Sequence, residues 1–280
     1  MKKNIVLILL LSLCFLTSLF AQKERYYNSL DEVINKVNNS KYEEALIIID
    51  SILEKEELIL LQKPYNQTHR FLSQTYGFKG QIEWMLDKDY KDSYFFKSIA
   101  YAKKNNDSIT IGKCYLNLGR AYETKADYAT SIQFYITSLP FVRKDCYLYS
   151  RTLDNIGYSL TLLTKYDKAY DYIQQAYSEA EECDNDYQKV FMYNSLAAFY
   201  LESKRNEDSI PYYLNKALIL STKVKHKEGL SITHSNYSDY YIKNKQFKEA
   251  IQHCKFGLNE SIELEDIESQ GQSLLQLGTI

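Results

Sequence analysis

The feature that most constrains this chain is a short phrase, a large apolar residue followed by a small one, that returns every 38 to 41 residues. Its copies are Leu118-Gly119, Ile156-Gly157, Leu196-Ala197, Tyr237-Ser238 and Leu277-Gly278. In four of them a further large apolar residue follows the small one by three positions: Tyr122, Leu160, Tyr200 and Tyr241. A fixed period of this length is typical of repeated supersecondary units that stack on one another.

A second block follows the first and opens an amphipathic stretch with apolar residues three and four apart. Its copies begin at Tyr42, Tyr90, Tyr128, Tyr166 and Phe247, each with a small residue three positions later. A small residue lets two helices approach closely, and a large residue one turn later fills the space beside the contact. The two blocks therefore predict a pair of helices in each unit, with each pair burying one face on the next.

These residues resemble the tetratricopeptide repeat family, in which Leu-Gly-x-x-Tyr in one helix is followed by Ala-x-x-x-Phe/Tyr-x-x-Ala in the next. The best copy runs from about Gly112 to Pro140 and carries Leu118, Gly119, Tyr122, Tyr128, Ser131, Tyr135 and Ser138. The period exceeds the 34 residues typical of the family, and the tryptophan position is empty. The resemblance implies an all-α fold, a right-handed α-solenoid of stacked antiparallel helix pairs.

Counting units along the chain predicts six helix pairs between residues 22 and 280 and the first helix of a seventh. A degenerate first unit runs from Tyr26 to about Glu57, and a second runs from Asn66 to Asn105 with an insertion around residues 77–84. Units three to six follow to about Glu265, and a seventh begins at Gly271. A lone first helix leaves its apolar face uncovered. We therefore expect either that the biological protein continues beyond Ile280 or that the chain is a pseudogene-like remnant.

The first 21 residues have the pattern of an export signal. Lys2 and Lys3 precede an apolar run from Ile5 to Phe20, and Ala21 is a small residue where a signal peptidase would cut. This predicts a signal peptide at residues 1–21 and a periplasmic or extracytoplasmic solenoid. An uncleaved membrane anchor is the alternative. Membrane association is expected only in that case, or if a further span follows the given sequence.

Charge and motifs argue against nucleic-acid binding and against catalysis. The formal charge of -2 becomes -4 once Lys2 and Lys3 leave with the signal, and no basic stripe offers phosphate contacts. The four histidines, His69, His226, His234 and His253, lack the short spacing that places two ligands on one helical face. No phosphate loop or nucleophile elbow occurs. We expect no enzyme, no cofactor and no metal site.

Four cysteines follow the signal: Cys114, Cys146, Cys183 and Cys254. Cys146 and Cys183 occupy nearly equivalent positions in neighbouring predicted units. Helix axes lie about 8 to 10 Å apart, which exceeds the usual span of a disulfide unless both residues sit in adaptable turns. Free buried thiols are therefore the expectation.

One column of residues suggests a binding surface. Immediately before the repeated phrase stand Asn117, Asn155, Ser195, Asn236 and Gln276. If the first helices line the inner face of a superhelix, this column and its helical neighbours Lys113, Arg120, Arg151, Tyr158 and Asp239 share that face. Carboxamides can hydrogen-bond the backbone of an extended peptide, and in the resembling family an asparagine here is a recurrent peptide clamp. Capping or bridging of neighbouring helices is the alternative.

Two functional classes follow from this pattern. The first is a non-catalytic scaffold that binds protein or peptide segments in the concave groove. The second is the extracytoplasmic sensor segment of a longer signalling protein, because the chain resembles exported repeat arrays that precede a histidine kinase or a DNA-binding output in some bacterial regulators. The partner and the oligomeric state are left open.

Overall fold

The computed structural model describes residues 28–37, 39, 41–62, 66–86, 92–183, 185–264 and 267–280. The predicted signal peptide, residues 1–21, lies outside these residues. Every regular element among them is helical, so the all-α prediction is confirmed. No described helix is long and apolar enough to cross a membrane.

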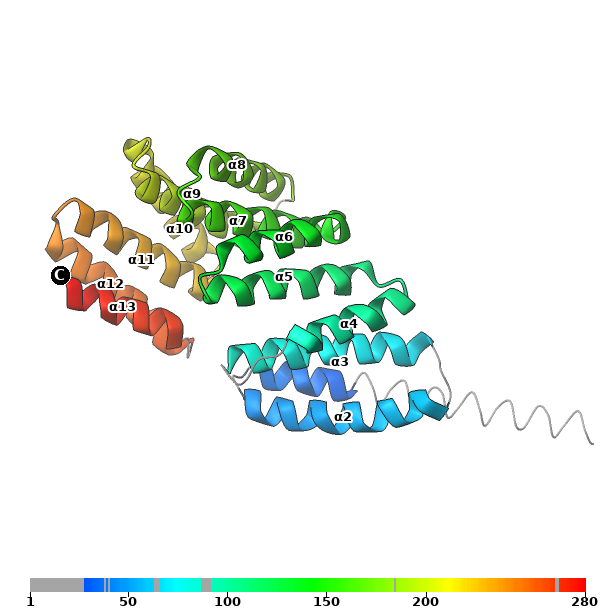
Figure 1. Cartoon of the computed structure of the whole chain (residues 1–280). Helices are drawn as coiled ribbons and strands as arrows, with labels where there is room; N and C mark the ends of the chain where they lie inside the picture. Colours follow the sequence, from blue (N-terminus) through cyan, green and yellow to red (C-terminus); the bar gives the residue numbers. More distant parts are fainter. Residues whose placement is uncertain are drawn as a thin grey trace, which may run out of the picture. The chain divides into compact units, whose positions relative to one another are not determined.

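The helices follow one another along the chain with short connections (Figure 1). After a helical segment at residues 28–37, they are α2 (Tyr42–Gln62), α3 (Asn66–Met85), α4 (Asp92–Lys104), α5 (Ser108–Thr124), α6 (Tyr128–Val142), α7 (Cys146–Leu162), α8 (Tyr166–Glu182), α9 (Asp186–Ser203), η1 (Glu207–Ser209), α10 (Ile210–Lys223), α11 (Lys227–Lys243), α12 (Phe247–Glu263) and α13 (Ile267–Thr279). Four predicted block starts, Tyr42, Tyr128, Tyr166 and Phe247, are the first residues of helices.

The described residues form two compact units, one up to Cys114 and one from Tyr115 onwards, with the boundary inside α5. In the first unit, α3 packs on both α2 and α4. Its core includes Ile49, Leu72 and Ile82, all fully buried. The insertion predicted around residues 77–84 is absorbed into α3, which runs unbroken to Met85. Gly80 admits the ring of Phe95, which lies 3.2 Å from where a Cβ would stand.

In the second unit, the small residue of the repeated phrase does what the sequence predicts. A Cβ on Gly119 would lie 2.4 Å from the ring of Tyr135, and one on Gly157 would lie 2.4 Å from Cγ1 of Ile173. Real Cβ atoms are not found that close to another heavy atom. In these two pairs, the helices therefore touch through a glycine on the first helix and a large buried side chain on the second.

The connections turn through left-handed residues that are not glycine. Ala126, Thr164 and Lys245 have φ angles of 58°, 57° and 60°. After the first helix ends, the backbone amide of the residue that follows the left-handed one reaches back, as when Lys165 N donates to Leu160 O at 2.9 Å. This is the Schellman arrangement, which usually takes glycine. Because no glycine occupies these left-handed positions, the sequence does not mark them as this type of turn.

The fifth repeat, α9 and α10, departs from the pattern at its second helix, where the sequence shows no block of the expected type. A 3-10 turn, η1, leads into α10, and Pro211 lies in the first turn of that helix. Proline is tolerated there because the first amides of a helix have no partner within the helix. The block pattern does not detect α10, because this helix begins with Ile210 and Pro211 and has no aromatic first residue.

Candidate binding face on the first helices

The first helices of the pairs form a continuous row in the second unit. Helix α7 packs on α9, α9 on α11, and α11 on α13. Among the described second helices α6, α8, α10 and α12, no two pack against each other. Elements on the inner side of a curved stack lie closer together than those on the outer side. The first helices therefore line the inner side of this unit, as the sequence analysis assumed.

The polar column before the repeated phrase links neighbouring first helices in its later copies. Asn236 Nδ2 donates to Asn194 Oδ1 at 3.1 Å, and Gln276 Nε2 donates to Asp239 Oδ1 at 2.7 Å. Ser195 Oγ donates to Asp154 Oδ2 at 2.9 Å. These contacts are the bridging alternative that the sequence left open. They tie each first helix to the next one.

The earlier copies of the column differ from the later ones. Asn117 on α5 and Asn155 on α7 are both half-buried, and none of the described hydrogen bonds uses their side chains. Whether they hold a ligand stays a prediction. The column therefore has two parts. On α9, α11 and α13 its side chains bridge neighbouring first helices, and on α5 and α7 its carboxamides form no such bridge among the described hydrogen bonds.

The predicted basic residues Arg120 and Arg151 lie on α5 and α7, the helices that carry Asn117 and Asn155. Arg120 and Arg151 are half-buried, and Tyr158 is 48% exposed. Arg151 Nη1 donates to the hydroxyl of Tyr147 at 2.6 Å, and its guanidinium lies 5.8 Å from the centre of that ring. Burial, together with the positive charge of Arg151, lowers the pKa of Arg120. Lys113 is exposed and belongs to the first unit, so it is described apart from the others.

The sequence analysis missed one charged residue on this face, Asp154. Its Oδ1 is buried and has no hydrogen-bond partner in the part of the chain that the structure describes. Burial raises the pKa of its carboxyl to about 7, although Ser195 and Arg151 both favour the charged form. Asp154 and Asn194 hold the same repeat position, one residue before the amide column. Polar residues at a position that packs between helices were the available signal.

The tetratricopeptide repeat family model matches residues 112–139, the copy that contains Gly119 and Tyr135. The match covers one of the repeat units of this chain. No curated protein matches its sequence.

Three solved structures share the fold of this chain. BtubC (BKLC) from P. vanneervenii is 15% identical, with a TM-score of 0.63 over 81% of this chain and 93% of its own. A signal transduction ATPase with numerous domains (STAND), with a tetratricopeptide repeat sensor, from Pyrococcus horikoshii is 16% identical, with a TM-score of 0.62 over 91% of this chain. The repeat protein spans only 42% of that chain.

The third structure is a Rap protein in complex with competence and sporulation factor, 14% identical, with a TM-score of 0.56 over 89% of this chain and 80% of its own. Identities this low show a shared fold and no more. Tetratricopeptide repeats are in general non-catalytic modules for protein interaction.

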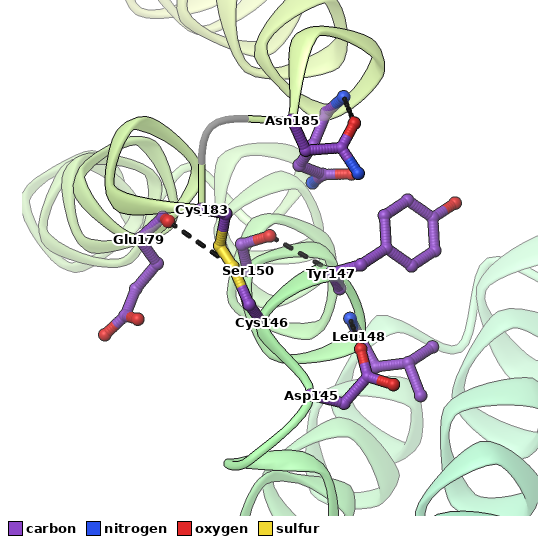
Figure 2. The surroundings of a disulfide bond; sticks show 9 residues. Asp145, Cys146, Tyr147, Leu148, Ser150, Glu179, Cys183 and Asn185 are labelled. Atoms are coloured by element: carbon purple, nitrogen blue, oxygen red, sulfur yellow. Dashed lines mark hydrogen bonds between the residues drawn. A yellow bond between two sulfur atoms is a disulfide. The ribbon is translucent and has the colours of Figure 1, made fainter.

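The cysteines of the repeat protein correct one expectation. Cys146, the first residue of α7, and Cys183, which caps the C-terminus of α8, form a disulfide (Figure 2). Their Cα atoms lie 6.1 Å apart, within the usual range for a disulfide. The expectation of free thiols assumed the spacing of helix axes, whereas both residues sit at helix ends that converge. Cys114 and Cys254 are free and buried, as expected.

Proposed function

We propose that this chain is a scaffold that binds an extended protein or peptide segment along the inner side of its first helices. The observation that carries the proposal is the pair Asn117 and Asn155, on neighbouring first helices and outside the hydrogen-bond network that occupies the rest of the column. A carboxamide offers both a donor and an acceptor, which is what a peptide backbone requires. The coarser part, a protein-interaction module, follows from the repeat family itself.

The flanking charges give the proposed site a preference. Arg120 and Arg151 lie on the same two helices as the asparagines, and the positive charge of Arg151 contributes to the lowered pKa of Arg120. Two guanidinium groups in a partly desolvated position favour an anionic partner, because a carboxylate relieves their mutual repulsion. The proposed ligand is therefore an extended segment with acidic side chains opposite α5 and α7.

Export of the chain is also part of the proposal. The basic start, apolar run and Ala21 support a signal peptide. The disulfide between Cys146 and Cys183 supports it independently, because disulfides persist in oxidising compartments and are rare in the cytosol. The second candidate is the sensor segment of a longer signalling protein. The likeness to a STAND protein with a tetratricopeptide repeat sensor favours it, since this chain spans 42% of that protein.

The binding proposal is tested by selection from a phage-displayed library of random linear peptides. The wild-type protein should enrich acidic peptides, and Asn117→Ala combined with Asn155→Ala should lose most of that enrichment while keeping its helical circular dichroism. Gln133→Ala combined with Gln175→Ala is the matched control, because both glutamines are exposed on second helices. Equal enrichment by the asparagine variant and by wild type would refute the assignment of the site.

Compartment and class are tested together by immunoblot of fractionated native cells, run with and without reductant. A soluble exported band near 32.9 kDa, less the signal segment, would support the scaffold. A much heavier band in the membrane fraction would support the sensor. A cytosolic band with reduced cysteines would contradict the export proposal.

A further inference from the structure

The sixth helix pair, α11 and α12, differs from the other pairs at two facing positions. One position lies three residues before the large residue of the repeated phrase, and it holds Tyr115, Leu153, Tyr193 and His234 in units three to six. The other lies in the second helix and holds Phe134, Tyr172, Tyr213 and His253. Only the sixth unit has a nitrogen-bearing side chain at both positions, although the whole chain has only four histidines.

The other units show what these positions do for packing. The rings of Tyr115 and Phe134 lie 6.3 Å apart, and those of Tyr193 and Tyr213 lie 6.4 Å apart. An aromatic pair therefore fills this place between the helices without any ring nitrogen. Two imidazoles are not needed to hold the hairpin together, since phenyl and phenol rings serve in its neighbours.

In the sixth unit the two imidazoles face each other through the same nitrogen. His234 Nδ1 and His253 Nδ1 lie 2.9 Å apart. Other rings surround them: Tyr237 stacks on His253 at 4.6 Å and Phe256 stacks on His234 at 5.3 Å. Gly257 lies beside His234, since a Cβ there would make an ordinary contact with Cβ of His234 at 3.5 Å. The pair is partly buried and fixed from both helices.

We propose that His234 and His253 bind a late divalent transition-metal ion of the Ni²⁺, Cu²⁺ and Zn²⁺ group between their Nδ1 atoms. Imidazole nitrogens bind such ions at about 2.0 to 2.1 Å. Two nitrogens 2.9 Å apart can both reach one ion at that distance, with an angle of about 90° at the metal. Adjacent ligands of an octahedral or square-planar ion stand at this angle.

The protonation of the pair suits this role. Burial lowers the pKa of His234 to about 4, with the neighbouring His253 adding to the effect, and burial also lowers the pKa of His253. Both rings are therefore neutral at pH 7. Metal binding requires each ring to carry its proton on Nε2, which is a change of tautomer in one ring with no net gain or loss of protons.

The site offers two protein ligands. No cluster of three or more His, Cys, Asp or Glu side chains able to hold a metal ion occurs in the part of the chain that the structure describes. Cys254 follows His253 but points away from the pair, with its Sγ 2.9 Å from Ser238 Oγ. Water must complete the coordination, so the bound ion exchanges with solvent and differs from a closed structural zinc site.

The test is thermal unfolding of tag-free protein, residues 22–280, with and without NiCl₂, and with MgCl₂ as the control ion. An ion that binds only the folded state raises the melting temperature as its concentration increases. Wild type should show a rise with Ni²⁺ and none with Mg²⁺, which prefers oxygen ligands. His69→Gln should keep the full Ni²⁺ effect.

The matched variant is His234→Tyr combined with His253→Phe, which copies the pair found in the third unit. It should fold with its helical content intact and lose the Ni²⁺ effect. His253→Gln alone should lose it as well. An absence of any Ni²⁺ effect in wild type, or an effect of equal size in the Tyr/Phe variant, would overturn the proposal.

Discussion

Two helix pairs of the same array, α7–α8 and α11–α12, differ in the bond that joins the start of the first helix to the end of the second. In α7–α8 the start of the first helix and the end of the second are joined by the Cys146–Cys183 disulfide. In α11–α12 the same corner holds an ion pair between Lys227 and Glu263, whose side chains are 49% and 60% exposed. The pair α9–α10 has an ion pair there too, between Lys223 and Asp186.

The comparison separates what the repeat fixes from what each copy adds. The contact along each pair is conserved in kind: Gly157 lies against Ile173, and Ser238 lies against Cys254. The corner is free to vary because it lies at the edge of the pair and buries little surface. A covalent bond and an exposed ion pair occupy equivalent positions but differ in their expected contribution to stability by several kcal/mol.

The largest expected effect comes from removing the disulfide. Cys146→Ser combined with Cys183→Ser should lower the free energy of unfolding by about 4 kcal/mol, because the bond closes a loop of 37 residues in the unfolded chain. Urea unfolding with and without dithiothreitol measures this. Wild type should become as unstable as the variant when reduced, and the variant should not respond to reductant. A reductant response that persists in the variant would place the effect elsewhere.

The next effect concerns Asp154, which has no charged counterpart in α11, where Ser235 holds the same position. The folded-state pKa of Asp154 is about 7, above the value near 3.9 of an unfolded chain. Its favourable contribution is therefore complete below pH 4 and is lost as pH rises to 7. Asp154→Asn should remove this loss, so the variant should exceed wild type by about 4 kcal/mol at pH 8 and match it near pH 4.

Urea unfolding across that pH range, for both proteins in the presence of EDTA, measures the effect. In the other helix pair, the contribution of His234 to stability depends on pH in the opposite direction. Its folded-state pKa is lowered to about 4, so its contribution is complete above pH 6.5 and is lost as pH falls towards 4. A constant difference between Asp154→Asn and wild type at every pH would contradict the assigned role of the carboxyl.

A smaller effect is expected from filling the contact along α7–α8. Gly157→Ala places a methyl group 2.4 Å from Ile173 and should destabilise the protein by about 2 kcal/mol through overpacking. Gly278→Ala is the control, because no atom lies within 4 Å of a Cβ at that position in α13. The control should be neutral or slightly stabilising, since alanine favours a helix over glycine. Equal melting temperatures for the two variants would contradict the close contact.

The smallest effect is expected at the ion-paired corner. Lys227→Met removes the pair with Glu263 and should cost about 0.5 kcal/mol, since exposed ion pairs contribute little. The difference from wild type should shrink further in high salt, because salt screens exposed charges. Melting curves at low and high ionic strength measure it. A loss as large as that of the disulfide variant would erase the distinction between the two corners.

Much of the fold could be predicted from the chain because its pattern is local. The starts of α2, α6, α8 and α12 coincide with the predicted aromatic residues, since a helix begins where its amphipathic pattern begins. The start of α10 was missed, because Pro211 and the short η1 replace the aromatic signal. The left-handed conformation at Ala126 and Thr164 could not be predicted, because no glycine marks either position.

The site was predicted less completely than the fold. Periodicity places Asn117, Asn155 and Asn236 on one face, but it does not show that Asn236 is already engaged with Asn194 while Asn155 is outside the described network. Asp154 was missed because a single carboxylate in a helix resembles any solvated charge until its burial is known. The histidine pair was not predicted, because short sequence spacing indicates only ligands on one helical face, whereas His234 and His253 come from different helices.

The sequence by itself determined that the chain is a row of helix pairs, where four of the second helices begin, and that Gly119 and Gly157 lie at close helix contacts. These properties depend on periods of a few residues within one helix and on a repeat that returns along the chain. Only the tertiary structure decided which side chains meet across helices: the joined Cys146 and Cys183, the facing His234 and His253, and the buried Asp154. Such meetings depend on how helices converge at their ends and cross along their length, and the spacing of residues in one helix does not specify either.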